Sequence, residues 1–179
     1  TRVHDYYEYL WDRHRGLNEE NLLHDLPDSL RLDIMVHLAR DVLEQVPLFR
    51  HCSPPLRNAL LCALEPTTYA PGNFLVREGD AGRSIVFITR GEVEIVVGEE
   101  QTVHGRMGPG DYFGYLSLAL KERRSGSVRA CDYCETLVLD QDSYEVLSAD
   151  YPEFREALKA VSAERSEQAS ELLLAGVVL

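Results

Sequence analysis

The stretch VREGDAGRSIVFITRGEVEI, residues 76–95, decides the predicted fold of this chain. It holds an apolar run at residues 85–88, then an alternation of glutamate with valine or isoleucine over residues 92–95. Nine of the twelve glycines in the chain lie between Gly72 and Gly114, so they separate many short segments. Short segments rich in β-branched and aromatic residues, divided by glycine turns, indicate an antiparallel sandwich or barrel.

Helical patterns precede this β region. Apolar residues recur at spacings of three and four on two stripes, one with Val3, Tyr6, Tyr7, Leu10 and Trp11, the other with Leu32, Met35, Val36, Ala39, Val42, Leu43 and Val46. Such spacing is typical of amphipathic helices. Ser53 and Pro54 form an N-cap and first-turn pair, which predicts one more helix that carries Leu56, Leu60 and Leu64.

Helical signals return after the strand predicted at Leu137–Leu139. Two pairs have the spacing of a capping box, Asp142 with Glu145 and Asp150 with Glu153. Pro152 is tolerated in the first turn of the last helix. The predicted fold class is therefore α+β, with a helical front end, an antiparallel β-roll or jelly roll over about residues 66–139, and C-terminal helices over about residues 142–175.

The composition excludes several classes of function. The chain of 179 residues has 18 basic and 30 acidic residues, a formal net charge of −12. Binding of nucleic acid needs a dense basic surface, so we expect no nucleic-acid partner. Any anion must be bound by a local group of hydrogen-bond donors or cations. The longest apolar run, residues 172–179, is shorter than the roughly 20 residues of a membrane-spanning helix. The sequence has no metalloprotease, nucleophile-elbow or Walker motif and no metal-ligand spacing of histidines, so we expect no enzyme, cofactor or metal.

The four cysteines, Cys52, Cys62, Cys131 and Cys134, are too few and too scattered for a disulfide scaffold. Cys131 and Cys134 form a C-x-x-C pattern, which is typical of redox pairs and of half a zinc site. We interpret them as ordinary strand cysteines, because the flanking segment alternates like a strand and residues three apart then lie on opposite faces. Such cysteine usage fits a reducing compartment.

The stretch FGYLSLALKERRSGSVRA, residues 113–130, carries the candidate chemistry. Gly114 permits a close approach of the backbone to a ligand, and the next residues predict one helical turn whose free N–H groups suit an anion. Arg124 adds a guanidinium fork, and Ser125 a hydroxyl donor, for the same phosphate. On spacing alone, a turn with solvated arginines explains the stretch equally well.

This stretch resembles the phosphate-binding cassette of cyclic-nucleotide-binding domains, whose pattern runs F-G-E-[IL]-x-L and then R-[TS]-A. The resemblance implies a cyclic AMP or cyclic GMP ligand, with Arg124 paired to the cyclic phosphate and Ser125 beside it. The ligand-binding residues that it implies in this stretch are Phe113, Gly114, Tyr115, Leu116, Ser117, Arg124, Ser125, Gly126 and Val128. Tyr115 departs from the pattern, because the family usually has a glutamate there that accepts a hydrogen bond from the ribose 2′-hydroxyl. A tyrosine has a different reach and no charge at neutral pH, so we expect a weaker ribose contact.

The opening segment HDYYEYLWDRHRGLNEENLLHDLPDSLRLDI, residues 4–34, is similar to the C-linker of cyclic-nucleotide-regulated cation channels. Such channels are cyclic-nucleotide-gated, hyperpolarization-activated or prokaryotic potassium channels. The resemblance implies a partial helical C-linker over residues 1–45 and a cyclic-nucleotide-binding domain over residues 46–179. It further implies a homotetramer assembled through the linker, at the cytoplasmic face of the membrane. We expect this chain to be a piece of such a protein, attached to the membrane only through a pore domain that lies before Thr1.

The predicted last helix carries an arginine on its apolar stripe. Arg165 falls between Leu158 and Val161 on one side and Ala169 and Leu172 on the other. An arginine there must reach water or meet a polar partner. In the related domains this helix closes over the base as a lid, so the resemblance implies that Arg165 contacts the purine and Ala169 covers it. Snorkelling of Arg165 to water is the alternative.

We interpret the chain as a regulatory module in which lid closure over a bound cyclic nucleotide is coupled to pore gating. Three alternatives stay open. A transcription regulator would follow the sensor with a helix-turn-helix, and a kinase regulatory subunit would normally carry two such domains. A degenerate domain that binds no nucleotide is favoured by Tyr115 and opposed by Arg124.

Overall fold

The computed structural model describes residues 52–160 together with Pro27, Val46 and Phe49. Apart from Pro27, these residues belong to the second of two compact units, residues 39–179. The helices predicted within residues 1–45 lie outside the described residues. No helix among the residues that are described is both long and apolar enough to cross a membrane.

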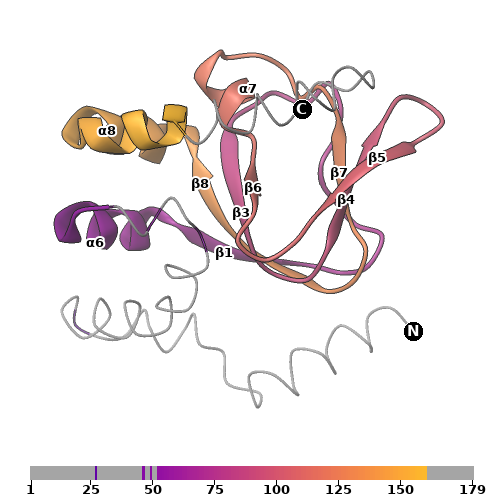
Figure 1. Cartoon of the computed structure of the whole chain (residues 1–179), viewed down its shortest axis with the longest axis horizontal. Helices are drawn as coiled ribbons and strands as arrows, with labels where there is room; N and C mark the ends of the chain where they lie inside the picture. Colours follow the sequence, from indigo (N-terminus) through magenta and orange to yellow (C-terminus); the bar gives the residue numbers. More distant parts are fainter. Residues whose placement is uncertain (1–26, 28–45, 47–48, 50–51, 161–179) are drawn as a thin grey trace. The chain divides into compact units, whose positions relative to one another are not determined.

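The centre of the described region is a pair of antiparallel sheets, which confirms the predicted α+β fold with a β-roll (Figure 1). One sheet has the order β1-β8-β3-β6 and the other the order β2-β7-β4-β5. The strands are β1 (Glu65–Tyr69), β2 (Phe74–Val76), β3 (Ser84–Arg90), β4 (Val93–Val97), β5 (Thr102–Met107), β6 (Tyr112–Phe113), β7 (Ser127–Ala130) and β8 (Cys134–Asp140).

The two sheets enclose the core that the apolar patterns predict. Residues 85–88 are all buried, because β3 pairs with β8 on one side and with β6 on the other while both of its faces are covered. The Phe87 ring lies 5.0 Å from that of Phe49 and 5.5 Å from that of Tyr112, measured between centroids. In the second sheet, Val93 and Ile95 are buried, as their alternation with glutamate predicts.

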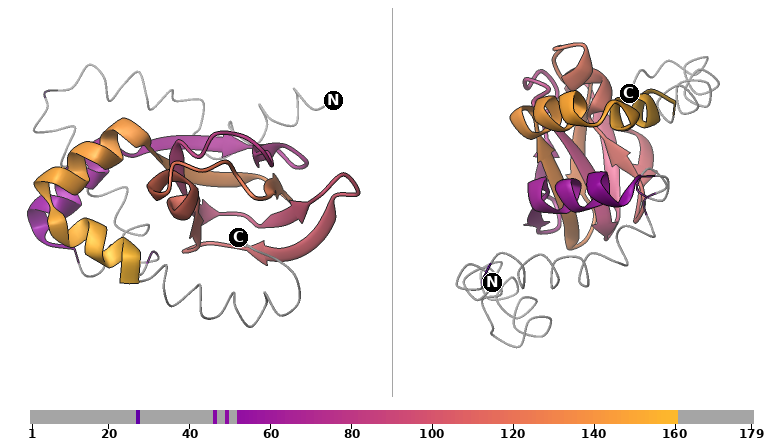
Figure 2. Two further views of the ribbon diagram at one scale, coloured as in Figure 1. Left: turned by 90° about the horizontal axis from the view of Figure 1, so that it is seen from above. Right: turned by 90° about the vertical axis from the view of Figure 1, so that its left-hand side faces the viewer.

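Helices cover one end of the roll. They are α6 (Pro54–Ala63), α8 (Gln141–Asp150) and a further helix that is described from Pro152 to residue 160. The short α7 (Tyr115–Ala119) lies between β6 and β7. Helices α6 and α8 lie side by side (Figures 1 and 2). Ser53 and Pro54 begin α6 as predicted, although the Ser53 hydroxyl donates to Glu153 Oε1 at 3.0 Å and makes no capping bond.

Both predicted capping boxes were wrong. The N-cap of α8 is Asp140, whose carboxylate accepts from the Ser143 backbone N–H at 2.7 Å. Because β8 runs to Asp140, the helix begins where the strand ends, and Asp142 falls within the first turn. Asp150 is the last residue of α8, so the next helix begins after Tyr151. Pro152 does lie in its first turn, as predicted.

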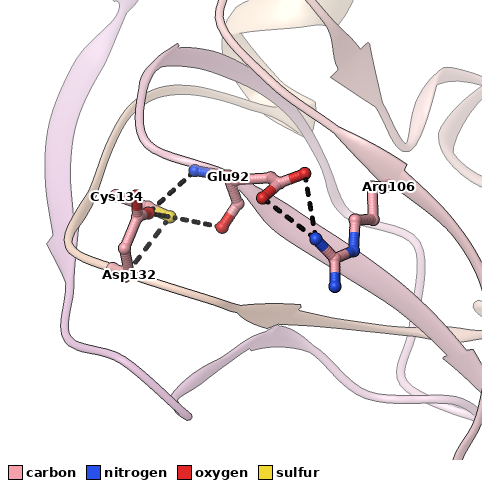
Figure 3. Close-up of polar contacts among 4 residues, drawn as sticks. All are labelled: Glu92, Arg106, Asp132 and Cys134. Carbon is pink, nitrogen blue, oxygen red and sulfur yellow. Dashed lines mark hydrogen bonds and ion pairs between the residues drawn. The ribbon is translucent and has the colours of Figure 1, made fainter.

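The C-x-x-C cysteines lie at what we call the corner, residues 91–92 and 131–134, where the turn from β3 to β4 meets the connection from β7 to β8 (Figure 3). The expectation that both cysteines share one strand was wrong, because Cys131 lies in the connection and Cys134 begins β8. Cys131 is exposed and Cys134 is buried, and all four cysteines of the chain are free. The described residues hold no group of three or more metal-ligating side chains.

Polar contacts close the corner. Asp132 Oδ1 accepts from the Glu92 backbone N–H at 2.8 Å, and the Cys134 thiol donates to the Glu92 carbonyl oxygen at 3.1 Å. The Glu92 carboxylate in turn pairs with exposed Arg106 at 3.3 Å (Figure 3). Burial raises the pKa of Cys134 to about 12, so this thiol is protonated and unreactive at neutral pH.

Candidate anion-binding site

The cassette, residues 113–130, begins with a turn that only glycine fits. Gly114 is the N-cap of α7 and has φ +96°, in the left-handed region. A Cβ atom at this position would collide with Arg124 Nη1 and lie 2.6 Å from the Ser84 carbonyl oxygen. Glycine is therefore required both by the backbone conformation and by the close passage of Arg124.

Arg124 lies inside the cassette, with only 6% of its surface exposed. Its Nη1 donates to Ser117 Oγ at 2.8 Å, and its Nη2 donates to the Ser84 carbonyl oxygen at 2.7 Å and to Ser84 Oγ at 3.2 Å. Within the described region, Nε is buried and has no hydrogen-bond partner. The alternative of solvated arginines is thus wrong for Arg124, whereas exposed Arg123 fits it.

The charge of Arg124 is poorly balanced by its contacts. Its side-chain hydrogen bonds, as far as the structure describes them, go to neutral oxygens. Burial lowers the pKa of Arg124, and the charge of Asp80 opposes this shift. An arginine stays charged at any physiological pH, so a desolvated cation with a spare donor remains. An anion that enters beside it gains a charge-assisted hydrogen bond.

The loop from β2 to β3 holds the cassette in place through its backbone. The Arg124 N–H donates to the Asp80 carbonyl oxygen at 2.8 Å, and the Arg124 carbonyl oxygen accepts from the Gly79 N–H at 2.9 Å. The Gly82 N–H donates to the Glu122 carbonyl oxygen at 3.1 Å. These bonds fix the backbone of Arg124 before any ligand binds.

Backbone amides supply further donors. The first described hydrogen bond of α7 runs from the Leu118 N–H to the Gly114 carbonyl oxygen, at 3.1 Å. The N–H groups of residues 115–117 precede that bond and so have no partner within the helix. The same turn contains Ser117, to which the Arg124 guanidinium is bound. Amides and guanidinium therefore belong to one small region of the fold.

The other predicted cassette residues lie in different surroundings. Tyr115 is buried, and its ring lies edge-on to that of Tyr144 in α8, with 6.3 Å between centroids. Burial, with a hydrogen bond to Tyr144, raises the pKa of Tyr115 to about 12, so this side chain is neutral. The ring is thus packed against α8, a contact that the sequence pattern did not indicate. Leu116, in contrast, is 43% exposed.

The end of the cassette contributes to the inner wall of the roll. Val128 is buried in a core cluster that also packs against Phe113. A Cβ at Gly126 would lie 3.2 Å from Val97 Cγ2, and Ser125 is exposed. Arg165 and Ala169 lie outside the described residues, so their predicted contacts with the base stay predictions. Ser84 was missed, because a serine at the start of a strand gives no signal of its own.

Comparison with known proteins defines the class of this fold and site. Residues 66–151 match the family model of the cyclic nucleotide-binding domain, so the β-roll with its buried arginine belongs to that family.

The similarity to particular proteins extends across nearly the whole chain. The chain is 32% identical over 169 residues to the potassium/sodium hyperpolarization-activated cyclic nucleotide-gated channel 1 of rabbit and of human. It is also 32% identical over 170 residues to the potassium/sodium hyperpolarization-activated cyclic nucleotide-gated channel 4 of mouse. Each match covers 93% of this chain, but only 19%, 18% and 14% of the respective relatives. The chain thus spans less than a fifth of the length of these relatives.

Proposed function

We propose that this chain is the ligand-sensing region of a cyclic-nucleotide-gated cation channel, and that cyclic AMP, cyclic GMP or both bind at Arg124. The observation that carries the proposal is a buried guanidinium in a domain of the cyclic nucleotide-binding family. Among the described residues, its hydrogen bonds go only to neutral oxygens and its Nε has no partner. The monoanionic cyclic phosphate supplies the missing negative charge and accepts the spare N–H groups.

The ligand would be read by several parts of the cassette. Arg124 and the amides of residues 115–117 bind the cyclic phosphate, and Ser125 lies beside it. Phe113, Gly126 and Val128 form the wall next to the sugar and base. This division of roles has support from the burial of Arg124 and Val128 and from the close approach at Gly114.

Gating follows from closure of the C-terminal helix. We propose that Arg165 contacts the purine and Ala169 covers it, so that a bound nucleotide favours the closed lid. The movement would then pass to a linker over residues 1–45 and to a pore domain. The parent protein would be a homotetramer joined through that linker, with this region at the cytoplasmic face of the membrane and no enzymatic activity. Similarity to channels over 93% of the chain supports this reading over a transcription regulator or a kinase subunit.

A second candidate is a domain of the same fold that binds no nucleotide. Two observations favour it. Tyr115 is packed against Tyr144, and the terminal nitrogens of Arg124 already have serine partners. The observation against it is the buried Nε of Arg124, which has no partner in the part of the chain that the structure describes.

Calorimetric titration of the 179-residue chain with each nucleotide separates the two candidates. The wild type should bind at least one of them, and Arg124→Ala should weaken binding at least tenfold, the loss of about 1.5–3 kcal/mol expected for a hydrogen bond to a charged group. Arg106→Ala removes an exposed arginine of β5 that pairs with Glu92, and this variant should bind like the wild type. A wild type that binds neither nucleotide, or an Arg124→Ala variant with unchanged affinity, contradicts the proposal.

A further inference from the structure

Two loops meet beside Arg124, and we call them together the rim: residues 77–83, between β2 and β3, and residues 121–124, after α7. An isolated antiparallel bridge pairs Ala81 with Arg123 at the middle of this contact. The Arg123 Nη1 also donates to a carbonyl oxygen of the other loop at 2.6 Å. Charged side chains of either loop therefore begin close to the buried guanidinium.

The rim is basic, although the chain as a whole is strongly acidic. It holds five basic and three acidic residues, whereas the chain has a formal net charge of −12. Every charged residue of the rim except Arg124 is exposed. The carboxylates of Glu78 and Asp80 accept from backbone N–H groups, at 2.9 Å and 3.0 Å. In the part of the chain that the structure describes, no ion pair involves the exposed cations of the rim, which are Arg77, Arg83, Lys121 and Arg123.

Lys121 occupies its position at a cost in backbone strain. Its φ is +55°, a conformation that glycine adopts more easily. The chain has one other lysine, Lys159, and that one is paired with Glu156 at 3.2 Å. A cation near the last carbonyls of the five-residue α7 offsets only part of the strain. Strain at an exposed residue without a described ion pair points to a role for the charge itself.

We propose that Arg83 and Lys121 steer the anionic nucleotide toward Arg124 and raise its rate of association, without contacting the bound ligand. This inference rests on the proposed function. A chain with a net charge of −12 repels a monoanion at long range, and a local excess of cations offsets that repulsion on the approach to the site. Because neither side chain has a described ion pair, each charge acts on the surrounding solvent undiminished by a partner.

Strand β3 offers a matched control, because an exposed arginine lies at each of its ends. Arg83 directly precedes the strand beside the cassette, and Arg90 is the last residue of the strand. Six residues of extended strand separate Ser84 from Arg90, a length of about 20 Å. The screening length at 0.1 M salt is about 10 Å, so a charge at Arg90 acts only weakly on a ligand that approaches Arg124.

Stopped-flow mixing of the 179-residue chain with a fluorescent cyclic AMP analogue measures the rate constants of association and dissociation. At about 0.1 M salt, Arg83→Glu and Lys121→Glu should each lower kon about twofold, and the double variant about fourfold. At about 1 M salt, where the screening length is about 3 Å, the variants should match the wild type. The value of koff should stay unchanged in both conditions.

Arg90→Glu makes the same change in net charge as either single variant and should leave kon unchanged. Thermal unfolding of each variant confirms that the protein in the kinetic experiment is folded. The comparison of Arg83→Glu with Arg90→Glu therefore separates the position of a charge from its effect on the net charge of the chain.

Three results overturn the inference while the proposed function stands. Equal kon for the double variant and the wild type shows that the rim does not steer the ligand. Faster dissociation with unchanged kon shows that the cations contact the bound nucleotide instead. Equal slowing by Arg90→Glu shows that the net charge of the chain acts, and not the rim. A wild type that binds neither cyclic AMP nor cyclic GMP overturns the proposed function itself.

Discussion

The corner and the cassette are two places where loops far apart in sequence are brought together at a glycine with positive φ. At the corner, Gly91 lies in close contact with the connection from β7 to β8. At the cassette, Gly114 lies in close contact with the Arg124 side chain. The two regions differ in the partners of their charged side chains. The Asp132 carboxylate at the corner is bound by a backbone N–H, and the Glu92 carboxylate is paired with Arg106. Arg124 is a buried cation that contacts neutral oxygens only, as far as the structure describes it. A glycine with positive φ thus occurs in both regions. At the corner the charged groups have partners that stabilise the fold, whereas at the cassette the Arg124 charge has no described counterion.

The comparison is tested most strongly by adding a methyl group at each glycine. Gly114→Ala should destabilise the fold by about 2–4 kcal/mol, because it strains a left-handed backbone and overlaps Arg124. Gly91→Ala should have a similar cost, because its Cβ would lie 2.6 Å from the Tyr133 carbonyl oxygen. Chemical denaturation measures the free energy of unfolding of both variants. Calorimetry on the folded variants should show lost nucleotide binding for Gly114→Ala alone; equal loss for both would erase the distinction between the regions.

Asp132→Ala removes the acceptor that closes the corner. It leaves the Glu92 N–H without its partner and should reduce the free energy of unfolding by about 1–2 kcal/mol. Nucleotide affinity should not change, because no described contact joins Asp132 to the cassette. Urea unfolding followed by titration checks both statements. A variant as stable as the wild type would show that the corner is held by its apolar contacts.

The buried thiol of the corner predicts a stability that depends on alkaline pH. The pKa of Cys134 is raised in the folded chain from 9.0 to about 12, so the folded state binds this proton more tightly than the unfolded state. The resulting stability is complete below pH 9 and is lost as the pH rises toward 12, by about 1.4 kcal/mol per pH unit. Denaturation of the wild type and of Cys134→Ala between pH 8 and pH 10.5 should show a shallower decline in the variant. Parallel declines would rule out Cys134 as the source.

The smallest expected effect lies at the end of α7. Lys121 has φ +55°, and the Glu122 N–H bonds the Ser117 carbonyl oxygen while the Lys121 N–H bonds that of Leu118. This is the Schellman arrangement, in which the left-handed position is usually glycine. Lys121→Gly should therefore raise the free energy of unfolding by about 0.5–1 kcal/mol. A loss of stability on urea denaturation would show that Lys121 makes a contact that outweighs the strain.

Sequence reasoning predicted the β-roll because its evidence is local. Glycine turns and the apolar run at residues 85–88 predict strands, whichever neighbours those strands pair with. The capping boxes failed because Asp140 and Asp142 are both good N-caps, and the end of β8 decided between them. Arg124 was found through the pattern around it. Its partner Ser84 was not, because a contact across 40 residues depends on sheet pairing that no local pattern encodes.

Tyr115 shows the same limit. Nothing in the cassette pattern indicated that its ring packs against Tyr144. Its predicted contact with the ligand stays a prediction. An aromatic ring gains more from burial beside α8 than from a polar pocket, and Tyr144 provides the hydrogen-bond partner that a buried hydroxyl needs. That preference depends on a helix that begins 26 positions later in the chain.

A crystal structure of the 179-residue chain with cyclic AMP tests most directly whether the unmet charge of Arg124 is the binding determinant. We expect a phosphate oxygen within about 2.7–2.9 Å of Arg124 Nε or Nη1, with Nη2 still bound to Ser84. A nucleotide bound elsewhere, or a phosphate that leaves Nε without a partner, would contradict the account.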